Sequence, residues 1–301
     1  MVGATGGAGS PSGSGDVTAG LLEGAPVAER VLAEVAAEVA ALRADGMTPG
    51  LGTILVGDDP ASASYVAKKH EACRRVGIAS AHEHLAATAT QADLLSVIKS
   101  FNSDPAVDAY LVQLPLPAGF DEEQALVAID PDKDGDGLHP FNLGRLVIGA
   151  DGPVPCTPAG IQALLVHYGV PIEGRHVVIV GRGITLGRPL ALLLASKRPN
   201  ANAAVTVVHT GVRDLARYTV QADILVAAAG RAGLVTPDMV KPGAAVVGGG
   251  ITWEGRRLAS DVAEAVAGVA GWVTPRLGGV GPTTVAMLLR NTAAAASRRK
   301  A

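Results

Sequence analysis

A tyrosine and a lysine stand four residues apart in the stretch SASYVAKKHEAC, which runs from Ser62 to Cys73. If this stretch is helical, Tyr65 and Lys69 share one helix face. A lysine that its neighbours hold in place can carry protons in catalysis, whereas most lysines are solvated surface residues. The spacing alone allows both interpretations.

Three further side chains in the first half of the chain could take part in chemistry. Gln113 lies in VQLPLP at the end of a strand-like run, and Asp134 and Asp136 lie in DKDGDG. Gln113 could instead hydrogen-bond to backbone at the strand end, and the aspartates could simply form a turn. A calcium loop fits less well, because the glutamate that closes an EF-hand loop is missing.

A glycine-rich loop follows a strand-like run in the second half. The stretch VVIVGRGITLGRP places Gly181, Gly183 and Gly187 between an apolar run and a helix with Pro189 in its first turn. Such glycines let backbone N–H groups approach a pyrophosphate at a helix N-terminus. The spacing is one residue longer than the usual dinucleotide fingerprint, so an ordinary strand-to-helix turn remains an alternative. A Tyr-x-x-x-Lys pair also occurs in short-chain dehydrogenases, but there the glycine loop precedes the tyrosine, and here it follows.

The next strand indicates which dinucleotide the loop would bind. NAD sites normally end this strand in an acidic residue, which binds the ribose 2′-hydroxyl. Here VTVVHT ends in His209 and Thr210, with Arg213 shortly after and Arg182 in the glycine loop itself. Donors in place of an acid favour the 2′-phosphate of NADP, although His209 could also be a surface residue at a strand end.

These candidates lie on elements that alternate between helix and strand. In the first half we expect a helix over 26–46, a strand over 51–57, the helix with Tyr65, a helix over 92–102 and a strand over 107–117. After the turn-rich segment 129–142, Rossmann-like βαβ repeats are expected. The last helix, from Gly281, has no strand after it and could pack back on the first domain.

The predicted fold class is therefore α/β, with an N-terminal α/β catalytic domain, a Rossmann-like NADP-binding domain and an active-site cleft between them. The predicted boundaries are a disordered, glycine- and serine-rich tail over 1–17, a first domain over 18–155 plus 277–301, and the Rossmann domain over 156–276.

The composition excludes several classes of function. A formal charge of -3 without a basic patch argues against nucleic acid as a partner. The longest apolar runs are too short to span a bilayer. Two cysteines, Cys73 and Cys156, form neither a disulfide framework nor a metal-ligand cluster, so no metal site is expected. We expect a cytoplasmic protein without a signal peptide or membrane contact, with an aliphatic core because aromatic residues make up only 3%.

Taken in order, the motifs of this chain resemble one known family, the bifunctional methylenetetrahydrofolate dehydrogenase/methenyltetrahydrofolate cyclohydrolases of one-carbon metabolism. The matching stretches are VGDDPAS followed by YVAKK, VQLPLP, PDKDGDGLHPFNLGRL, PCTPAGI, GRHVVIVGRGITLGRP and GGVGPTTVAML. They cover nearly everything from about residue 20 onward. Several motifs of this length in one order are far more specific than any of them alone.

The resemblance implies an activity, namely NADP-dependent oxidation of 5,10-methylenetetrahydrofolate to the methenyl form and its hydrolysis to 10-formyltetrahydrofolate, in a homodimer. In the family pattern the lysine transfers protons, the glutamine tunes it, the tyrosine positions lysine and pterin, and the aspartate holds the pterin donors. The implied catalytic residues are Tyr65, Lys69, Gln113 and Asp136. With the donors after the second strand included, the expected NADP-binding residues are Gly181, Arg182, Gly183, Gly187, His209, Thr210, Arg213 and Ile251. Besides Tyr65, Gln113 and Asp136, the residues expected to contact folate are Gly278, Gly279, Pro282 and Thr283.

Three residues depart from the family pattern. Gly183 stands where the family usually has serine, Gly248 where it has aspartate, and Leu277 where it has proline. These departures could shift the balance of the two activities or the preferred folate. The alternatives are therefore a monofunctional or catalytically altered paralogue that retains NADP and folate binding, or a binding module without activity.

Overall fold

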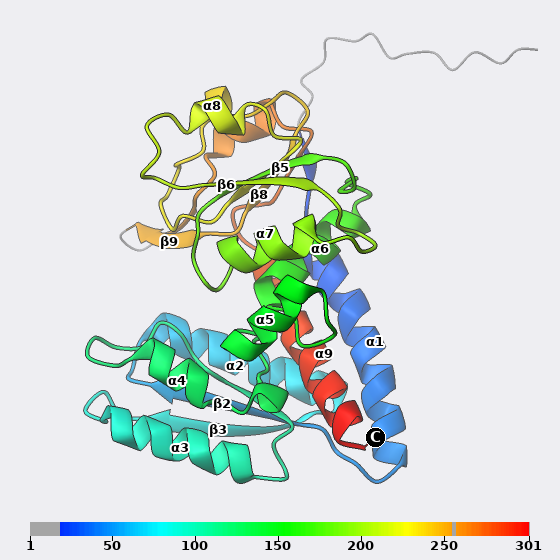
Figure 1. Cartoon of the computed structure of the whole chain (residues 1–301), viewed down its shortest axis with the longest axis vertical. Coiled ribbons are helices and arrows are strands. Elements are labelled where there is room, and N and C mark those ends of the chain that lie inside the picture. Colours follow the sequence, from blue (N-terminus) through cyan, green and yellow to red (C-terminus); the bar gives the residue numbers. More distant parts are fainter. Residues whose placement is uncertain (1–18, 255–256, 301) are drawn as a thin grey trace, which may run out of the picture.

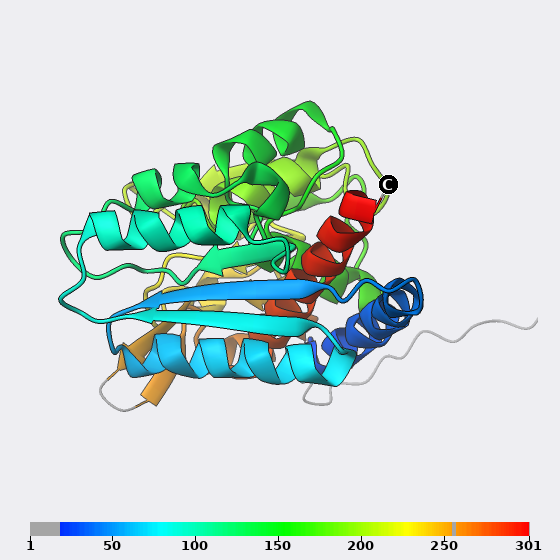
Figure 2. The same ribbon diagram turned by 90° about the horizontal axis from the view of Figure 1, so that it is seen from below.

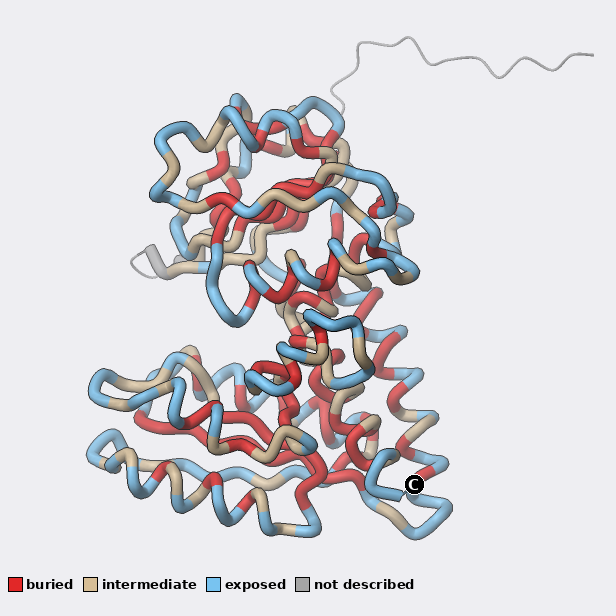
Figure 3. The backbone as a smooth tube through the Cα atoms, in the orientation of Figure 1, coloured by how far each residue is buried: buried red, intermediate tan, exposed pale blue. Residues whose placement is uncertain are grey.

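The chain folds into two α/β lobes, one above the other in Figure 1. The computed structural model describes residues 19–254 and 257–300, so the expected disordered tail over 1–17 lies outside the described residues. Buried backbone gathers in the two sheets and in the helices that join the lobes, as Figure 3 shows. Each lobe therefore has its own sheet core, and a helical layer is shared between them.

The lower lobe is built on a parallel sheet with the strand order β3–β2–β4. Every residue of β2 is buried, which is typical of a parallel strand covered on both faces. Figure 2 shows α2 and α3 on opposite faces of this sheet. The elements are β2 (Gly50–Val56), α2 (Pro60–Val76), β3 (Ala79–Leu85), α3 (Gln91–Ser103), β4 (Ala109–Val112) and α4 (Glu122–Ala128).

The upper lobe holds a six-stranded parallel sheet in the order β1–β11–β8–β7–β5–β6. Because β6 and β7 pair with opposite sides of β5, the strand order reverses at β5, which is the position where α/β proteins form ligand crevices. The Rossmann-like prediction is confirmed. The elements are β5 (His176–Val180), α7 (Gly187–Ala195), β6 (Ala204–Val208), α8 (Ala216–Thr219), β7 (Ile224–Ala227), η2 (Pro237–Met239), β8 (Ala245–Gly248), η3 (Glu264–Gly268), β11 (Trp272–Val273) and the antiparallel pair β9 (Ile251–Glu254) and β10 (Arg257–Ser260).

Long helices connect the lobes. The last helix, α9 (Val280–Lys300), runs beside α1 (Gly24–Ala44) and also packs against α6 (Cys156–His167). Apolar residues of α1 repeat at helical spacing and are buried in one cluster with α9, for example Val31, Val35 and Leu289. The last helix thus returns to the first half of the chain. The shorter elements between the lobes are η1 (Pro131–Lys133) and α5 (Pro140–Ile148).

Two features differ from the sequence expectations. The chain's first strand, β1 (Gly20–Leu21), pairs with β11 in the upper sheet, although the boundary at residue 18 assigns it to the lower domain. A two-residue strand is too short to show a pattern. The strand expected over 107–117 ends at Val112, because Pro115 and Pro117 have no N–H to donate to a ladder.

Candidate active site

A cavity of about 480 Å³ opens between the two lobes. The carboxyl ends of β5 and β8 face this region, which is the usual position of ligands in such sheets. Both lobes supply walls, so the cavity is the predicted interdomain cleft. The lining residues are Asp59, Ala61, Ser62, Tyr65, Lys69, Gln113, Leu114, Pro115, Asp136, Leu138, Cys156, Thr157, Thr185, Gly248, Gly249, Ile251, Val280, Gly281, Thr284 and Val285.

Helix α2 carries the tyrosine–lysine pair into the cavity. The Asp59 carboxylate caps the helix by accepting from the Ser62 N–H at 2.8 Å, and Pro60 occupies the first turn. Lys69 is only 7% exposed, whereas the neighbouring Lys68 is exposed and lies over the ring of Tyr65 at 5.6 Å. Tyr65 and Lys69 both line the cavity, as the shared helix face predicts.

Gln113 meets Lys69 at the end of β4. The Nζ of Lys69 donates to Oε1 of Gln113 at 3.0 Å. The Nε2 of the same amide donates to the Leu114 carbonyl at 2.8 Å, and this second bond fixes the orientation of the amide, because only nitrogen can face a carbonyl oxygen. Gln113 therefore presents an acceptor to Lys69 and holds its amine at the cavity wall.

The two aspartates of DKDGDG have different surroundings. The buried carboxylate of Asp134 accepts from the N–H groups of Gly137, Leu138 and His139 and from the Asn142 amide, so it organises the loop. Asp136 lines the cavity. The residue expected to hold the pterin thus faces the site, and its neighbour fixes the loop that carries it.

The surroundings of Asp136 favour its neutral form more than water would. Burial raises the pKa of Asp136 above its usual value, while the positive charge of Lys69 opposes that rise. Asp134 adds to the rise, and a hydrogen bond with the Cys156 thiol counteracts it. The carboxyl is therefore placed where a ligand with N–H donors would compensate its desolvation.

The start of α9 closes the cavity, but with residues other than those expected. Val280, Gly281, Thr284 and Val285 line it. Thr283 is fully buried, and its hydroxyl donates to the carbonyl of Val280 in its own helix. The carbonyl of Gly278 accepts from the Gly24 N–H at 2.8 Å, and a Cβ on Gly24 would lie 1.8 Å from the Gly279 carbonyl oxygen. Gly278 and Gly279 therefore pack against the start of α1. Pro282 is half-buried and does not line the cavity.

The glycine loop fits a dinucleotide. A Cβ on Gly181 would lie 2.1 Å from the carbonyl oxygen of Ala228, and one on Gly187 would lie 2.3 Å from the carbonyl oxygen of Gly181. These two glycines permit close packing of loop, strand and helix. A Cβ on Gly183 would meet no atom within 4 Å. The third glycine therefore borders open space in which a phosphate group could approach the backbone.

The expected phosphate donors do not line the cavity itself. Arg182 in the loop and Thr210 and Arg213 after β6 are exposed, and His209 is half-buried. The Nδ1 of His209 accepts from the Gly211 N–H at 3.1 Å, which holds the ring at the strand end. No acidic residue follows β6 directly, so the donor set suits a 2′-phosphate. Ile251 lines the cavity beside the segment that follows β8.

Several lining residues are absent from the sequence prediction. Cys156 and Thr157 open α6, Thr185 lies in the glycine loop, and Thr284 lies one turn into α9. The hydroxyl of Thr284 donates to that of Thr157 at 3.3 Å, which joins the two helix starts at the cavity wall. The PCTPAGI motif was the available signal, but a motif does not say which of its side chains faces a site.

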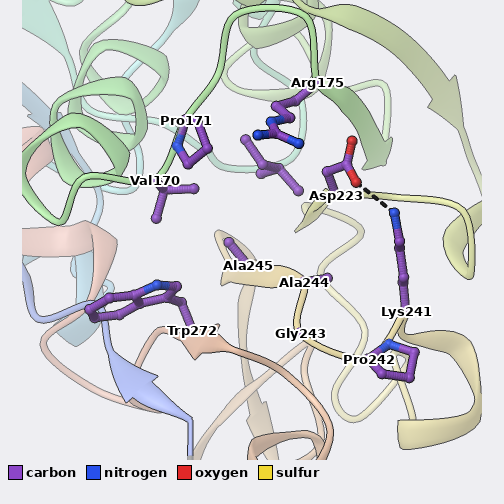
Figure 4. Close-up of a pocket in the computed structure, with 11 residues that line it drawn as sticks. Val170, Pro171, Arg175, Asp223, Lys241, Pro242, Gly243, Ala244, Ala245 and Trp272 are labelled. Carbon is purple, nitrogen blue, oxygen red and sulfur yellow. Dashed lines mark hydrogen bonds and ion pairs between the residues drawn. The ribbon is translucent and has the colours of Figure 1, made fainter. Parts of the chain in front are cut away.

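A second cavity, of about 270 Å³, lies at the amino ends of β7 and β8. Figure 4 shows Lys241 reaching the Asp223 carboxylate, 2.7 Å away, with Trp272 on the opposite wall. Asp223 also accepts from the His176 N–H, and the hydrogen bond from Lys241 is the main reason that its pKa is lowered. None of the described residues that line this cavity leaves a buried polar side-chain atom without a partner.

Within residues 19–254 and 257–300, no cluster of three or more histidine, cysteine or carboxylate side chains could hold a metal ion. In the same part of the chain, no helix combines the length and the hydropathy that crossing a bilayer requires. Both cysteines are free and buried.

Comparison with known proteins assigns the two lobes. The family model described as tetrahydrofolate dehydrogenase/cyclohydrolase, catalytic domain, matches residues 22–136, and the NAD(P)-binding domain model of the same family matches residues 155–300. The "Bifunctional protein FolD" of Syntrophotalea carbinolica is 63% identical over 283 residues, which cover 94% of this chain and 98% of that protein.

Solved structures agree. The bifunctional FolD of Campylobacter jejuni shares 42% identity with a TM-score of 0.88, and the match covers 93% of this chain and 99% of that one. The Trypanosoma brucei dehydrogenase-cyclohydrolase, solved with NADP cofactor and inhibitor, shares 40% identity with a TM-score of 0.88 and covers 94% of this chain and 98% of that one. This chain belongs to the tetrahydrofolate dehydrogenase/cyclohydrolase family.

Proposed function

We propose that this protein oxidises 5,10-methylenetetrahydrofolate to the methenyl form with NADP and then hydrolyses the product to 10-formyltetrahydrofolate. The observation that carries the proposal is the Lys69–Gln113 pair at 3.0 Å, in a cavity whose other wall belongs to the NAD(P)-binding lobe. A folate that undergoes both steps has to lie against a nicotinamide for the first and against a proton carrier for the second. The comparisons give no support to an altered or monofunctional paralogue.

The pterin is held by Asp136 and Tyr65. The pterin ring carries an amide N–H and an amino group side by side, and a carboxylate can accept from both. Such bonds would replace the hydrogen bonds from water that the Asp136 carboxylate loses through its burial. The partly exposed ring of Tyr65 offers an aromatic face to the substrate at the cavity mouth.

The first step depends on positioning. A nitrogen lone pair of the folate expels hydride from the bridging methylene carbon, and accepting that hydride is the chemistry that bound NADP supplies. No protein group has to remove a proton in this step. What the chain contributes is alignment, because the folate wall and the glycine loop meet across one cavity.

The second step needs proton transfer. Water adds to the methenyl carbon and loses a proton, and the bond from that carbon to the ring nitrogen then breaks as the hydroxyl proton moves to this nitrogen, which leaves the formyl group on the other nitrogen. The titratable side chains that line the cavity are Asp59, Tyr65, Lys69, Asp136 and Cys156. The pKa of Cys156 is raised well above its usual value by burial, so it stays a thiol, and Asp59 caps α2. With Asp136 assigned to the pterin, Lys69 is the proton carrier and Gln113 fixes its position.

The proposal is tested by steady-state assay of the purified protein with methylenetetrahydrofolate and NADP+, while the absorbance of the methenyl product is followed. Formation and then decay of that product above the uncatalysed rate is expected. Absence of formation would contradict the dehydrogenase assignment, and decay at the uncatalysed rate would contradict the hydrolase assignment.

The proposal includes a cytoplasmic homodimer joined through the upper lobe. Strand β6 stands at the end of the six-stranded sheet, and apolar side chains on and near it are exposed: Val207, Leu192, Val147 and Ile148. A second copy of the chain that covers this surface would remove an unprotected strand edge. Light scattering should give a molar mass of twice that of one chain. Val207→Asp should reduce the measured mass to that of a single chain.

A further inference from the structure

One side chain of the last helix contacts both segments that carry polar groups into the lower wall of the cavity. The Nδ2 of Asn291 lies 2.9 Å from the Gly135 carbonyl oxygen, 3.1 Å from that of Val154 and 3.5 Å from the sulfur of Cys156. Because two carbonyl oxygens face it, this atom must be the nitrogen of the amide. Asn291 therefore joins α9 to the residue before Asp136 and to the start of α6.

Cys156 completes the connection. Its N–H donates to the Asp136 carbonyl at 3.2 Å, and its thiol donates to the Gly135 carbonyl at 3.3 Å. The Gly135 N–H in turn donates to the Tyr110 carbonyl in β4 at 3.0 Å. The backbone on both sides of the Asp136 Cα is thus fixed from β4, α6 and α9, although Asp136 belongs to no helix or strand.

We infer that Asn291 is a positioning residue for Asp136: it holds the Gly135–Asp136 backbone and the Cys156 thiol so that the carboxyl meets the pterin. The inference rests on the proposed function, in which Asp136 binds the substrate. Asn291 itself does not line the cavity.

Asn291→Leu keeps the number and the branching of the side-chain heavy atoms and removes the donor. We expect its KM for folate to rise at least tenfold with kcat changed less than threefold, because the pterin contact is made in the ground state and the transition state alike. The KM for NADP should stay within twofold.

Thr292→Val is the matched control. Thr292 is fully buried on the same helix, but its hydroxyl donates only to the Leu288 carbonyl of that helix, at 2.9 Å. Its substitution should lower stability to urea and leave both KM values unchanged. Asn291→Ser, which is too short to reach the three acceptors, is expected to behave as Asn291→Leu and serves where the leucine variant fails to fold.

A double-mutant comparison separates this role from that of Asp136. Asp136→Asn should raise the KM for folate, and in that background Asn291→Leu should add less than twofold, because both act through one contact. If the two single effects on the KM for folate multiply in the double mutant, or if the Asn291 variants keep the wild-type KM, the positioning role alone would be overturned. A wild-type KM in Asp136→Asn would overturn the proposed function of Asp136 and this inference together.

Discussion

The Nζ of Lys69 and the Oε1 of Gln113 lie 3.0 Å apart, although 44 residues separate them in the sequence. The other end of the Gln113 amide is bound to the Leu114 carbonyl, so the acceptor cannot rotate away from the lysine. Lys68, one residue before Lys69, is exposed on another face of α2. Two adjacent lysines of one helix therefore have different roles.

Removing the buried lysine should abolish one activity only. We expect Lys69→Ala to lower methenyltetrahydrofolate hydrolysis by roughly 10²- to 10⁴-fold, the usual contribution of a positioned acid–base group. NADP binding, measured by fluorescence titration, should be retained because the glycine loop is untouched. Lys68→Ala is the matched control and should keep the wild-type hydrolysis rate. A Lys69→Ala variant that hydrolyses as fast as the wild type would contradict the assignment.

Much of this site was predictable because the signals are local. Glycine stops and apolar periodicity place α2, β5 and the glycine loop, and the ordered motifs identify Lys69, Gln113 and Asp136 as candidates. The family resemblance singles out Asp136, but the residue types alone could not show which aspartate of DKDGDG faces the cavity, because Asp134 and Asp136 have the same chemistry and lie two residues apart. That choice is made by the Asn142 amide and three backbone N–H groups, which bind Asp134.

The same limit applies at the start of α9. Thr283 of the GGVGPTT segment is among the residues expected to contact folate, but its side chain turns into the core and Thr284 faces the cavity. Successive residues of a helix differ by about 100° in direction. Which of two adjacent threonines points into the core depends on the element that the helix packs against. Here that element is α6, whose Gly160 leaves room for Thr283.

NADP should be strongly preferred over NAD. The donors after β6 and in the glycine loop would bind a 2′-phosphate, and the positions directly after β6 hold His209 and Thr210 in place of the acid that binds a free ribose hydroxyl. We expect kcat/KM to favour NADP+ at least tenfold, which corresponds to about 1.4 kcal/mol. His209→Asp should reverse the direction of this preference by repelling the phosphate. Equal use of the two cofactors by the wild type would rule out the assignment of these donors.

The protein should tolerate replacement of Gly183 by the serine that the family usually has at this position. A Cβ at this position meets nothing within 4 Å, so Gly183→Ser can be accommodated without a clash. Its hydroxyl would add one donor beside the cofactor phosphates, and a several-fold lower KM for NADP+ is expected, with thermal stability unchanged. A rise in that KM would show that the loop already fills the space when the cofactor binds.

The departure at Gly248 should behave differently. A Cβ there would lie 2.5 Å from the hydroxyl oxygen of Ser260 and 3.3 Å from that of Thr274. Gly248→Asp is expected to cost roughly 1–3 kcal/mol of unfolding free energy, toward the lower value because the Ser260 hydroxyl can rotate. The Cβ points at Ser260 of β10, but because Gly248 also lines the cavity, the KM for folate should be measured beside the stability. Gly248→Asp combined with Ser260→Gly should recover the lost stability in urea titration.

Acid should destabilise the protein through a histidine beside the active-site lysine. His70 packs against the buried Thr53, whose hydroxyl oxygen lies 3.0 Å from His70 Nε2 and 2.8 Å from His82 Nδ1. Burial lowers the pKa of His70, and the nearby His82, Arg74 and Lys69 lower it further. His70 therefore binds a proton less readily in the folded protein than in the unfolded chain.

The sign of the pH dependence follows from this difference. Above the ordinary histidine pKa of about 6.5 both states are neutral at this position and no stability is lost. As the pH falls below that value, the unfolded state binds the proton first, and stability decreases until the lower folded pKa is reached. His70→Gln should flatten the decrease in urea-unfolding free energy across this range, whereas His167→Gln, at an exposed position of α6, should keep the wild-type slope. An unchanged slope in His70→Gln would assign the acid sensitivity to other groups.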